Sequence, residues 1–266
     1  MKTQVVVNAN AAAFAGEPRL IAEVRQSAVG ADRVVVTRDL DELARAAAAM
    51  RADGVERVVL CGGDGTYMAG ITALAATGLD RLPEVCLAPG GTVATVAKNL
   101  GTRLGLLETV RRATTAASRL AVIEHPTLRV SETGGVTRIG FIFGTGLVAR
   151  FFQRYYQAGA GGHAAAAKIV ARVFVGSFVS DAYSRSVLDP LPCKLSVDGR
   201  VLRPDAYSLV VSSVVRDLGL HMWVTHRAAE DPDRPHLVAA PLSARDLHLQ
   251  GNHAGPVRQA LLSTRG

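Results

Sequence analysis

The sequence predicts an α/β domain with a parallel sheet, followed by a β-rich antiparallel domain with a helical insert. Two observations support this prediction. Over the first hundred residues, short runs rich in valine and leucine alternate with helix-like segments, a pattern typical of a parallel sheet covered on both faces. From about residue 121, strand-like runs are separated by "GG" and "DG" turns, which favour hairpins. We therefore expect domains at 1–120 and 121–266.

The elements of the first domain follow from local patterns. Strands are expected at residues 4–10, 33–37, 57–63 and 84–91. Helices are expected after Pro18 and at residues 41–54, 66–78, 93–101 and 106–120. Asp39 or Asp41 can cap the second helix, and Gly54 and Gly78 can end the second and third.

The second domain reads mainly as strands. They are expected at 124–144, 193–204, 206–215, 220–226 and 236–242. Two helical runs, at 146–159 and 163–185, form the predicted insert. No internal repeat or low-complexity linker separates the two domains.

Composition excludes several classes of protein. The 266 residues are 48% hydrophobic and 20% charged, which suits a folded globular chain. No apolar run approaches the roughly 18–20 residues of a membrane span, so we expect a soluble cytoplasmic protein. The three cysteines lack metal or disulfide spacing and are expected to be buried thiols. The formal charge of +7 comes from scattered arginines, so we expect no nucleic-acid partner.

The stretch "GGDGT" at residues 62–66 lies between a predicted strand and a predicted helix. Its glycines let backbone N–H groups approach a ligand, and the helix directs its positive end to the same point. This combination predicts a phosphate site. It is not a P-loop, which needs G-K-[ST]. Asp64 either contacts a magnesium ion or a ribose hydroxyl, or caps the following helix.

A second glycine turn strengthens the prediction of a nucleotide cleft. "APGGTVATVAKNLG", residues 88–101, again places Gly-Gly-Thr between a strand and a helix. The carboxyl ends of parallel strands meet at one edge of a sheet, where ligands bind. Asn8, Thr37 and both glycine turns should therefore converge there.

The two turns at this spacing resemble the catalytic domain of the diacylglycerol kinase and sphingosine kinase superfamily, in particular its bacterial lipid-kinase branch. "VVVNANAAAF" and "FIFGTGLVARF" are similar to further segments of that family. The resemblance implies a diacylglycerol kinase-like and NAD kinase-like fold with ATP in a cleft. It also implies transfer of the γ-phosphate of Mg-ATP to a hydroxyl of diacylglycerol or a related lipid, within phospholipid biosynthesis.

The resemblance also implies roles for individual residues. The ATP site would comprise Asn8, Thr37, Gly62, Gly63, Asp64, Gly65, Thr66, Gly91 and Thr92. Asp64 would be the catalytic residue, serving the metal or the acceptor hydroxyl. Asp231 and Asp233 lie where the family has its Asp-Gly-Leu magnesium loop, although that glycine is missing here, and an acidic surface turn is an equal interpretation.

Two departures from the family pattern keep other functions open. Ala94 replaces the family's asparagine after G-T-x, and the chain stops before the expected D-G-E segment, so we expect a second domain truncated at its C-terminus. These departures allow a catalytically weak or inactive nucleotide-binding protein. An NAD kinase-like enzyme is a further alternative, because that family also carries "GGDGT".

The expected partners are ATP and a lipid. Arg150, Arg154, Lys168 and Arg172 could face anionic headgroups at the inner membrane surface, which would make the protein peripheral to that membrane. The sequence leaves the oligomeric state open, with a homodimer as one option.

Overall fold

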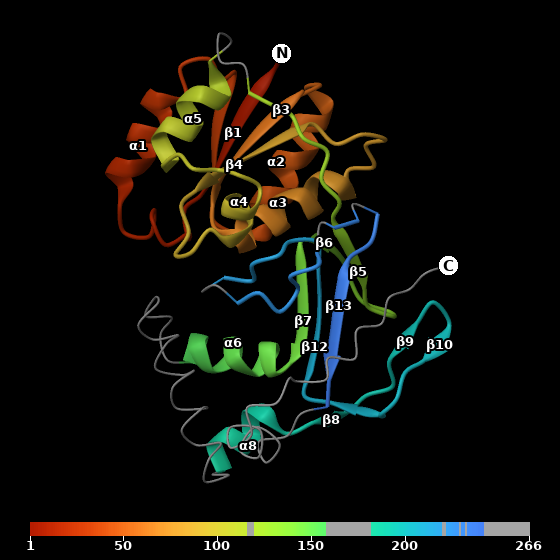
Figure 1. Ribbon diagram of the computed structural model, residues 1–266. Helices are drawn as coiled ribbons and strands as arrows, with labels where there is room; N and C mark the ends of the chain where they lie inside the picture. Colours follow the sequence, from red (N-terminus) through yellow and green to blue (C-terminus); the bar gives the residue numbers. More distant parts are fainter. Residues whose placement is uncertain (116–119, 158–181, 220–221, 229, 232, 242–266) are drawn as a thin grey trace. The chain divides into compact units, whose positions relative to one another are not determined.

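The computed structural model describes residues 1–115, 120–157, 182–219, 222–228, 230–231 and 233–241 (Figure 1). The chain forms two compact units. The first comprises Met1–Phe141, Val214–Trp223 and Ala229–Asp233. The second comprises Ile142–Ser213, Val224–Ala228 and Arg234–Gly266.

The first unit contains a four-stranded parallel sheet. Its strands are β1 (Thr3–Asn8), β2 (Arg33–Thr37), β3 (Arg57–Gly62) and β4 (Glu84–Pro89). Their order is β2-β1-β3-β4, and all neighbouring pairs are parallel. The register pairs Asn8 with Thr37 and Gly62 with Pro89. The segments that follow the strands therefore all start at one edge of the sheet, as predicted.

Helices cover both faces of this sheet (Figure 1). They are α1 (Pro18–Ser27), α2 (Leu40–Ala52), α3 (Asp64–Ala76), α4 (Thr95–Asn99) and α5 (Leu106–Thr114). Val24 of α1 and Val110 of α5 pack against Val5, Val7 and Val59 on one face. On the other face α3 approaches β3 so closely that a Cβ at position 70 would overlap the side chain of Leu60. The predicted fold class is confirmed for this unit.

The helix ends carry the predicted signals. The Asp39 carboxylate accepts a hydrogen bond from the Glu42 backbone N–H at 2.7 Å, so Asp39 caps α2. Gly54 and Gly78 follow α2 and α3 with φ angles of 64° and 73°, in the left-handed region that glycine favours.

An antiparallel pair extends the first unit beyond residue 120. Strands β5 (Leu128–Ser131) and β6 (Thr137–Gly140) form this pair. The Thr72 hydroxyl of α3 accepts the Ile139 N–H at 2.9 Å and donates to the Ile139 carbonyl at 3.1 Å. Because β6 is tied to α3 in this way, the compact unit runs to Phe141, whereas the sequence places residues 121–141 in the second domain.

The second unit is mainly antiparallel, as predicted. Its strands are β7 (Ile142–Gly146), β8 (Leu191–Pro192), β9 (Ser196–Val197), β10 (Arg200–Val201), β11 (Ala206–Tyr207), β12 (Leu209–Ser213) and β13 (His236–Ala240). They form a three-stranded sheet of order β13-β12-β7 and two short pairs, β8 with β11 and β9 with β10. Asp198 and Gly199 join β9 to β10 with φ angles of 50° and 77°, the backbone that a "DG" hairpin turn requires.

Two predicted elements of the second domain are not found as expected or lie largely outside the described residues. The strand predicted at 220–226 is wrong over its described part, because Met222 and Trp223 are in no strand and residues 224–228 form a turn. Most of the helix predicted at 163–185 lies outside the described residues. The helices described in this unit are α6 (Leu147–Gln157) and α8 (Ala182–Leu188). None of the helices in the described part of the chain is long and apolar enough to cross a bilayer.

Arg57 links the strand starts to α5. Its side chain, only 9% exposed, donates to the Glu84 carboxylate from Nε at 2.9 Å and from Nη2 at 2.6 Å. Its Nη1 donates to the Ala113 carbonyl near the end of α5 at 3.0 Å. One guanidinium thus joins β3, β4 and α5.

We expect Arg57→Met to lower the free energy of unfolding by about 2 kcal/mol, because the nearly buried guanidinium no longer donates its hydrogen bonds to Glu84 and Ala113. Denaturant unfolding measures the change. Arg19→Met is the matched control, since Arg19 is exposed on α1 and should change stability by less than about 0.5 kcal/mol. Equal effects of the two substitutions would contradict this role for Arg57.

Candidate active site

The turns that follow β3 and β4 touch through their backbones. The Gly90 N–H donates to the Gly62 carbonyl at 2.7 Å. A Cβ at position 63 would lie 3.0 Å from the Cα of Gly91, and one at position 91 would overlap the Cα of Gly63. The glycines are therefore required for the two turns to pack, in addition to any access that they give to a ligand.

The Asp64 carboxylate joins the two turns. Its Oδ2 accepts the Thr95 N–H at 3.0 Å, and its Oδ1 accepts the Val96 N–H at 2.9 Å. These two N–H groups lie in the first turn of α4, where backbone N–H groups have no acceptor within the helix. Asp64 thus caps a helix, as one interpretation of the sequence allows, but the helix is α4 and not the one that follows Asp64 in the chain. A carboxylate at a helix N-terminus is also favoured by the helix dipole.

Ala94 occupies the N-cap position of α4 in a left-handed conformation, with φ of 51° and ψ of 48°. Asparagine and glycine adopt this conformation more readily than alanine does. The conformation of the backbone therefore gives a reason for the family's asparagine at this position.

The start of α3 differs from that of α4. Its N-cap is Gly63, and no side chain among the described residues caps it. A Cβ at position 65 would meet nothing within 4 Å. The first N–H groups of α3 are therefore left without a side-chain acceptor, next to open space.

Asn8 and Thr66 are brought together as predicted. The Asn8 side-chain amide donates to the Thr66 hydroxyl at 2.8 Å, which links the end of β1 to the first turn of α3. The Asn8 side-chain oxygen accepts the Asn10 N–H at 3.0 Å. Both side chains thus have partners within the protein.

Two threonines of the predicted ATP site have different surroundings. Thr37 is buried, and its hydroxyl donates a hydrogen bond to the Val7 carbonyl at 3.5 Å. Its carbonyl accepts the Ala9 N–H at 2.9 Å, which fixes the start of the loop after β1. Thr92 is exposed, in the turn before α4. Their contact with a nucleotide stays a prediction.

The comparisons with known proteins agree with this geometry. Residues 2–124 match the model of the diacylglycerol kinase catalytic domain. The match covers the parallel sheet and both glycine turns, so the resemblance inferred from the sequence is confirmed for this part of the chain.

Solved structures are similar in fold. A diacylglycerol kinase from Bacillus anthracis str. Sterne is 19% identical, with a TM-score of 0.60, and the match covers 94% of this chain and 76% of that chain. Two further structures from the same strain are 18% and 17% identical, with TM-scores of 0.58 and 0.61, covering 90% and 98% of this chain and 72% and 82% of theirs. At these identities the similarity concerns the fold alone. No curated protein matches the chain.

The positions of the family's magnesium loop form an exposed turn. The Asp231 carboxylate accepts the Asp233 N–H at 2.9 Å, and both residues are exposed. Within the described parts of the chain, no group of three or more histidine, cysteine or acidic side chains could hold a metal ion. Asp231 and Asp233 as metal ligands therefore stay a prediction.

The sequence analysis missed three residues of the candidate site. Phe14 is buried under the second glycine turn, where a Cβ at position 90 would lie 2.9 Å from its ring. Asn99 donates from its amide to the Thr95 carbonyl at 2.9 Å and to the Asp217 carbonyl at 2.8 Å. The phenylalanine among small residues in "NANAAAF" was a signal for Phe14. Nothing local pairs Asn99 with Asp217, which lies 118 residues away.

Tyr67, the third missed residue, follows Asp64 by three positions in α3 and is fully buried. Burial raises the pKa of its hydroxyl, and the Asp64 charge adds to this shift. The hydroxyl has no hydrogen-bond partner among the described residues. Tyr67 is therefore a buried, uncharged phenol at neutral pH.

The arginines expected to face anionic lipids have contacts within the second unit. Arg150 donates to the Val187 carbonyl at 3.1 Å and the Asp189 carbonyl at 2.7 Å, at the end of α8. Arg154 donates to the Ser186 hydroxyl at 3.1 Å. Lys168 and Arg172 lie outside the described residues.

We expect Asp64→Ala to lower the free energy of unfolding by about 1 kcal/mol, because α4 loses its cap. Hydrogen exchange at the Thr95 and Val96 amides should accelerate. Asp80→Ala is the control, since Asp80 is exposed in a loop and should leave both quantities unchanged. Unchanged exchange at α4 in Asp64→Ala would exclude the capping role.

We expect Gly91→Ala to lower the free energy of unfolding by about 1–3 kcal/mol, because its methyl group would overlap the Gly63 backbone. Gly65→Ala should instead raise it by about 0.5–1 kcal/mol, since the methyl group enters open space and alanine favours the helix. Denaturant unfolding of both variants tests this contrast. A Gly91→Ala protein as stable as wild type would show that the turns do not pack as described.

Proposed function

We propose that the protein is an ATP-dependent lipid kinase that transfers the γ-phosphate of Mg-ATP to a hydroxyl of diacylglycerol or a related lipid. The family match at residues 2–124 supports a phosphotransferase with a lipid acceptor. It favours this acceptor over the NAD that an NAD kinase-like enzyme would use.

The uncapped start of α3 carries the proposal. The carboxylate in "GGDGT" bonds α4 and leaves the first N–H groups of α3 without a side-chain acceptor. Such groups, at the positive end of a thirteen-residue helix, bind phosphate well. Gly65 adds open space at the same point. We infer that nucleotide phosphates bind there.

The proposed reaction needs mainly positioning and neutralisation of charge. The acceptor oxygen forms a bond to the γ-phosphorus, the bond from this phosphorus to the bridging oxygen of ADP breaks, and the proton of the acceptor hydroxyl passes to Asp64 or to water. Asn8 and Thr66 hold the end of β1 against α3, and Asp64 holds α4 against the phosphate site. Thr37, Gly62, Gly63, Gly91 and Thr92 complete the proposed ATP site.

Magnesium would supply charge neutralisation between the phosphates when bound. It binds through one or two carboxylates together with substrate phosphates and water. Asp64 fits this requirement in chemistry, because each of its oxygens accepts one N–H and retains a further lone pair. Asp231 and Asp233 are the other proposed ligands. We further propose that the enzyme works at the cytoplasmic face of a membrane, where its lipid is found.

One observation favours an inactive nucleotide-binding protein as the second candidate. Both oxygens of Asp64 are engaged in capping α4, so the residue acts as a positioning residue in this geometry. Its assignment as the catalytic residue stays a prediction.

We expect wild type to bind ATP in calorimetry, more tightly with magnesium, and to transfer labelled γ-phosphate to diacylglycerol in mixed micelles. Gly65→Ala should fold normally and lose about tenfold or more in ATP affinity, because its methyl group displaces a phosphate from the backbone. Gly105→Ala is the matched control, since Gly105 also starts a helix next to open space, and its ATP affinity should equal that of wild type.

ATP binding with transfer to lipid would support the kinase. Binding sensitive to Gly65→Ala without transfer to any lipid would support the inactive alternative. If Gly65→Ala binds ATP as wild type does, the phosphates do not lie at the start of α3.

A further inference from the structure

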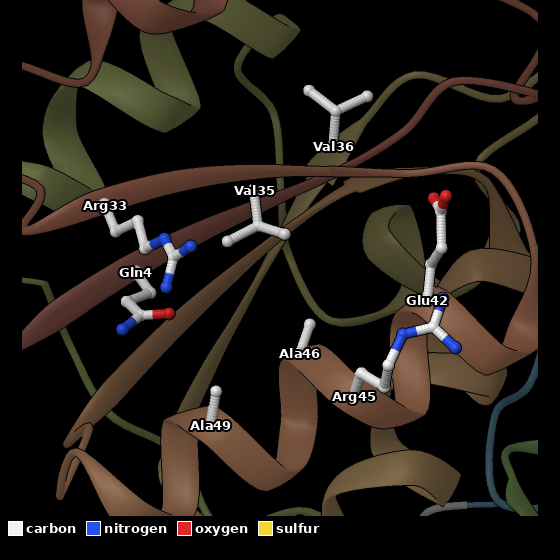
Figure 2. Close-up of a pocket in the computed structure, with 8 residues that line it drawn as sticks. All are labelled: Gln4, Arg33, Val35, Val36, Glu42, Arg45, Ala46 and Ala49. Atoms are coloured by element: carbon white, nitrogen blue, oxygen red, sulfur yellow. The ribbon is translucent and has the colours of Figure 1, made fainter.

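A separate pocket of about 360 Å³ lies between β2 and α2 (Figure 2). It opens beside the edge of the parallel sheet, where β2 pairs with β1 alone among the described strands. This volume is at the lower end of the range for small-molecule sites, which is about 300–1,000 Å³. The pocket could hold a small organic ligand and is too small for a whole diacyl lipid.

The pocket exists because small side chains face it from α2. Helix residues 42, 45, 46 and 49 line it, with the spacing of one helix face. Two of these, Ala46 and Ala49, are too short to reach β2. On the strand side, Arg33 and Val35 are two positions apart and therefore lie on the same face of the sheet. The result is an apolar floor of Val35, Ala46 and Ala49 (Figure 2).

Positive charge predominates at the pocket. Arg33, on the strand, and Arg45, on the helix, both line it (Figure 2). Neither guanidinium group makes a hydrogen bond or an ion pair within the described parts of the chain. The acidic residue of the lining, Glu42, already accepts the Arg38 N–H at 2.7 Å through its carboxylate. The two guanidinium groups lie at opposite ends of the pocket, Arg33 beside Gln4 and Arg45 beside Glu42 (Figure 2).

A buried amide adds a polar group at the strand end. Gln4 lines the pocket next to Arg33, its partner in the register of β1 and β2, and is only 3% exposed. Its Nε2 donates to the Asp53 carboxylate over a long distance of 3.4 Å. Guanidinium groups recognise carboxylate and phosphate oxygens through paired hydrogen bonds. An amide beside them can accept or donate one more.

We propose that this pocket binds a small organic anion, with a phosphate or carboxylate group held by Arg33 next to Gln4 and an apolar body on Val35, Ala46 and Ala49 that extends toward Arg45. The site is distinct from the glycine turns within the same unit, and the proposal does not rest on the proposed kinase activity.

Hexyl phosphate, hexanoate, inorganic phosphate and hexanol form a matched set of probes. We expect hexyl phosphate or hexanoate to bind more tightly than inorganic phosphate and hexanol, because only they combine charge with an apolar body. Their ranking distinguishes a phosphate ligand from a carboxylate ligand. Calorimetry gives the affinities, and amide NMR shifts at Val35, Ala46 and Ala49 locate the probe.

Arg33→Ala should weaken binding of the better probe by about tenfold, the effect of losing one charged hydrogen-bonding group. Arg45→Ala should weaken it less, because Arg45 lies at the other end of the pocket (Figure 2). Arg19→Ala is the control: Arg19 is exposed on α1, its replacement removes one positive charge as the other two substitutions do, and the variant should bind the probe as wild type does. The proposal fails if neither hexyl phosphate nor hexanoate binds, if all three variants weaken binding equally, or if a non-hydrolysable ATP analogue displaces the probe.

Discussion

The backbone contact between the two glycine turns is the constraint on which the candidate site depends. Gly63 and Gly91 meet so closely that neither position accommodates a side chain, and the Gly90 N–H bonds the Gly62 carbonyl. Close contact brings the start of α4 within reach of the Asp64 carboxylate. The cap on α4, the open start of α3 and the position of Phe14 all follow from this contact.

The negative charge of Asp64 is directed at backbone N–H groups of α4. A carboxylate next to a phosphate site would repel the ligand if it were free, since like charges disfavour each other. Here Asp64 directs both oxygens to the N–H groups of α4, which offset its charge. The N–H groups of α3 remain for an anion. One acidic residue can therefore stabilise the fold and leave the adjacent N-terminus of α3 without a side-chain cap.

Contacts to two distant parts of the chain, and the turn directly before the helix, fix α4. Asp64 bonds its N-terminus, and Asn99 at its end binds both backbone groups of Asp217, in a segment that returns from beyond β12. Ala94 holds the left-handed turn before the helix. A helix of only five residues has little stability of its own. Its place at the candidate site depends on these tertiary bonds.

The sequence by itself determined the order of strands and helices in the parallel sheet, the antiparallel character of the second unit and the convergence of Asn8, Thr37 and the glycine turns. These features follow from hydrophobic periodicity and turn residues, which act over a few positions. Only the tertiary structure decided that Asp64 caps α4, that Asn99 binds Asp217 and that residues 121–141 pack with the first unit. Each of these depends on contacts between residues far apart in the chain, for which local sequence patterns carry no signal.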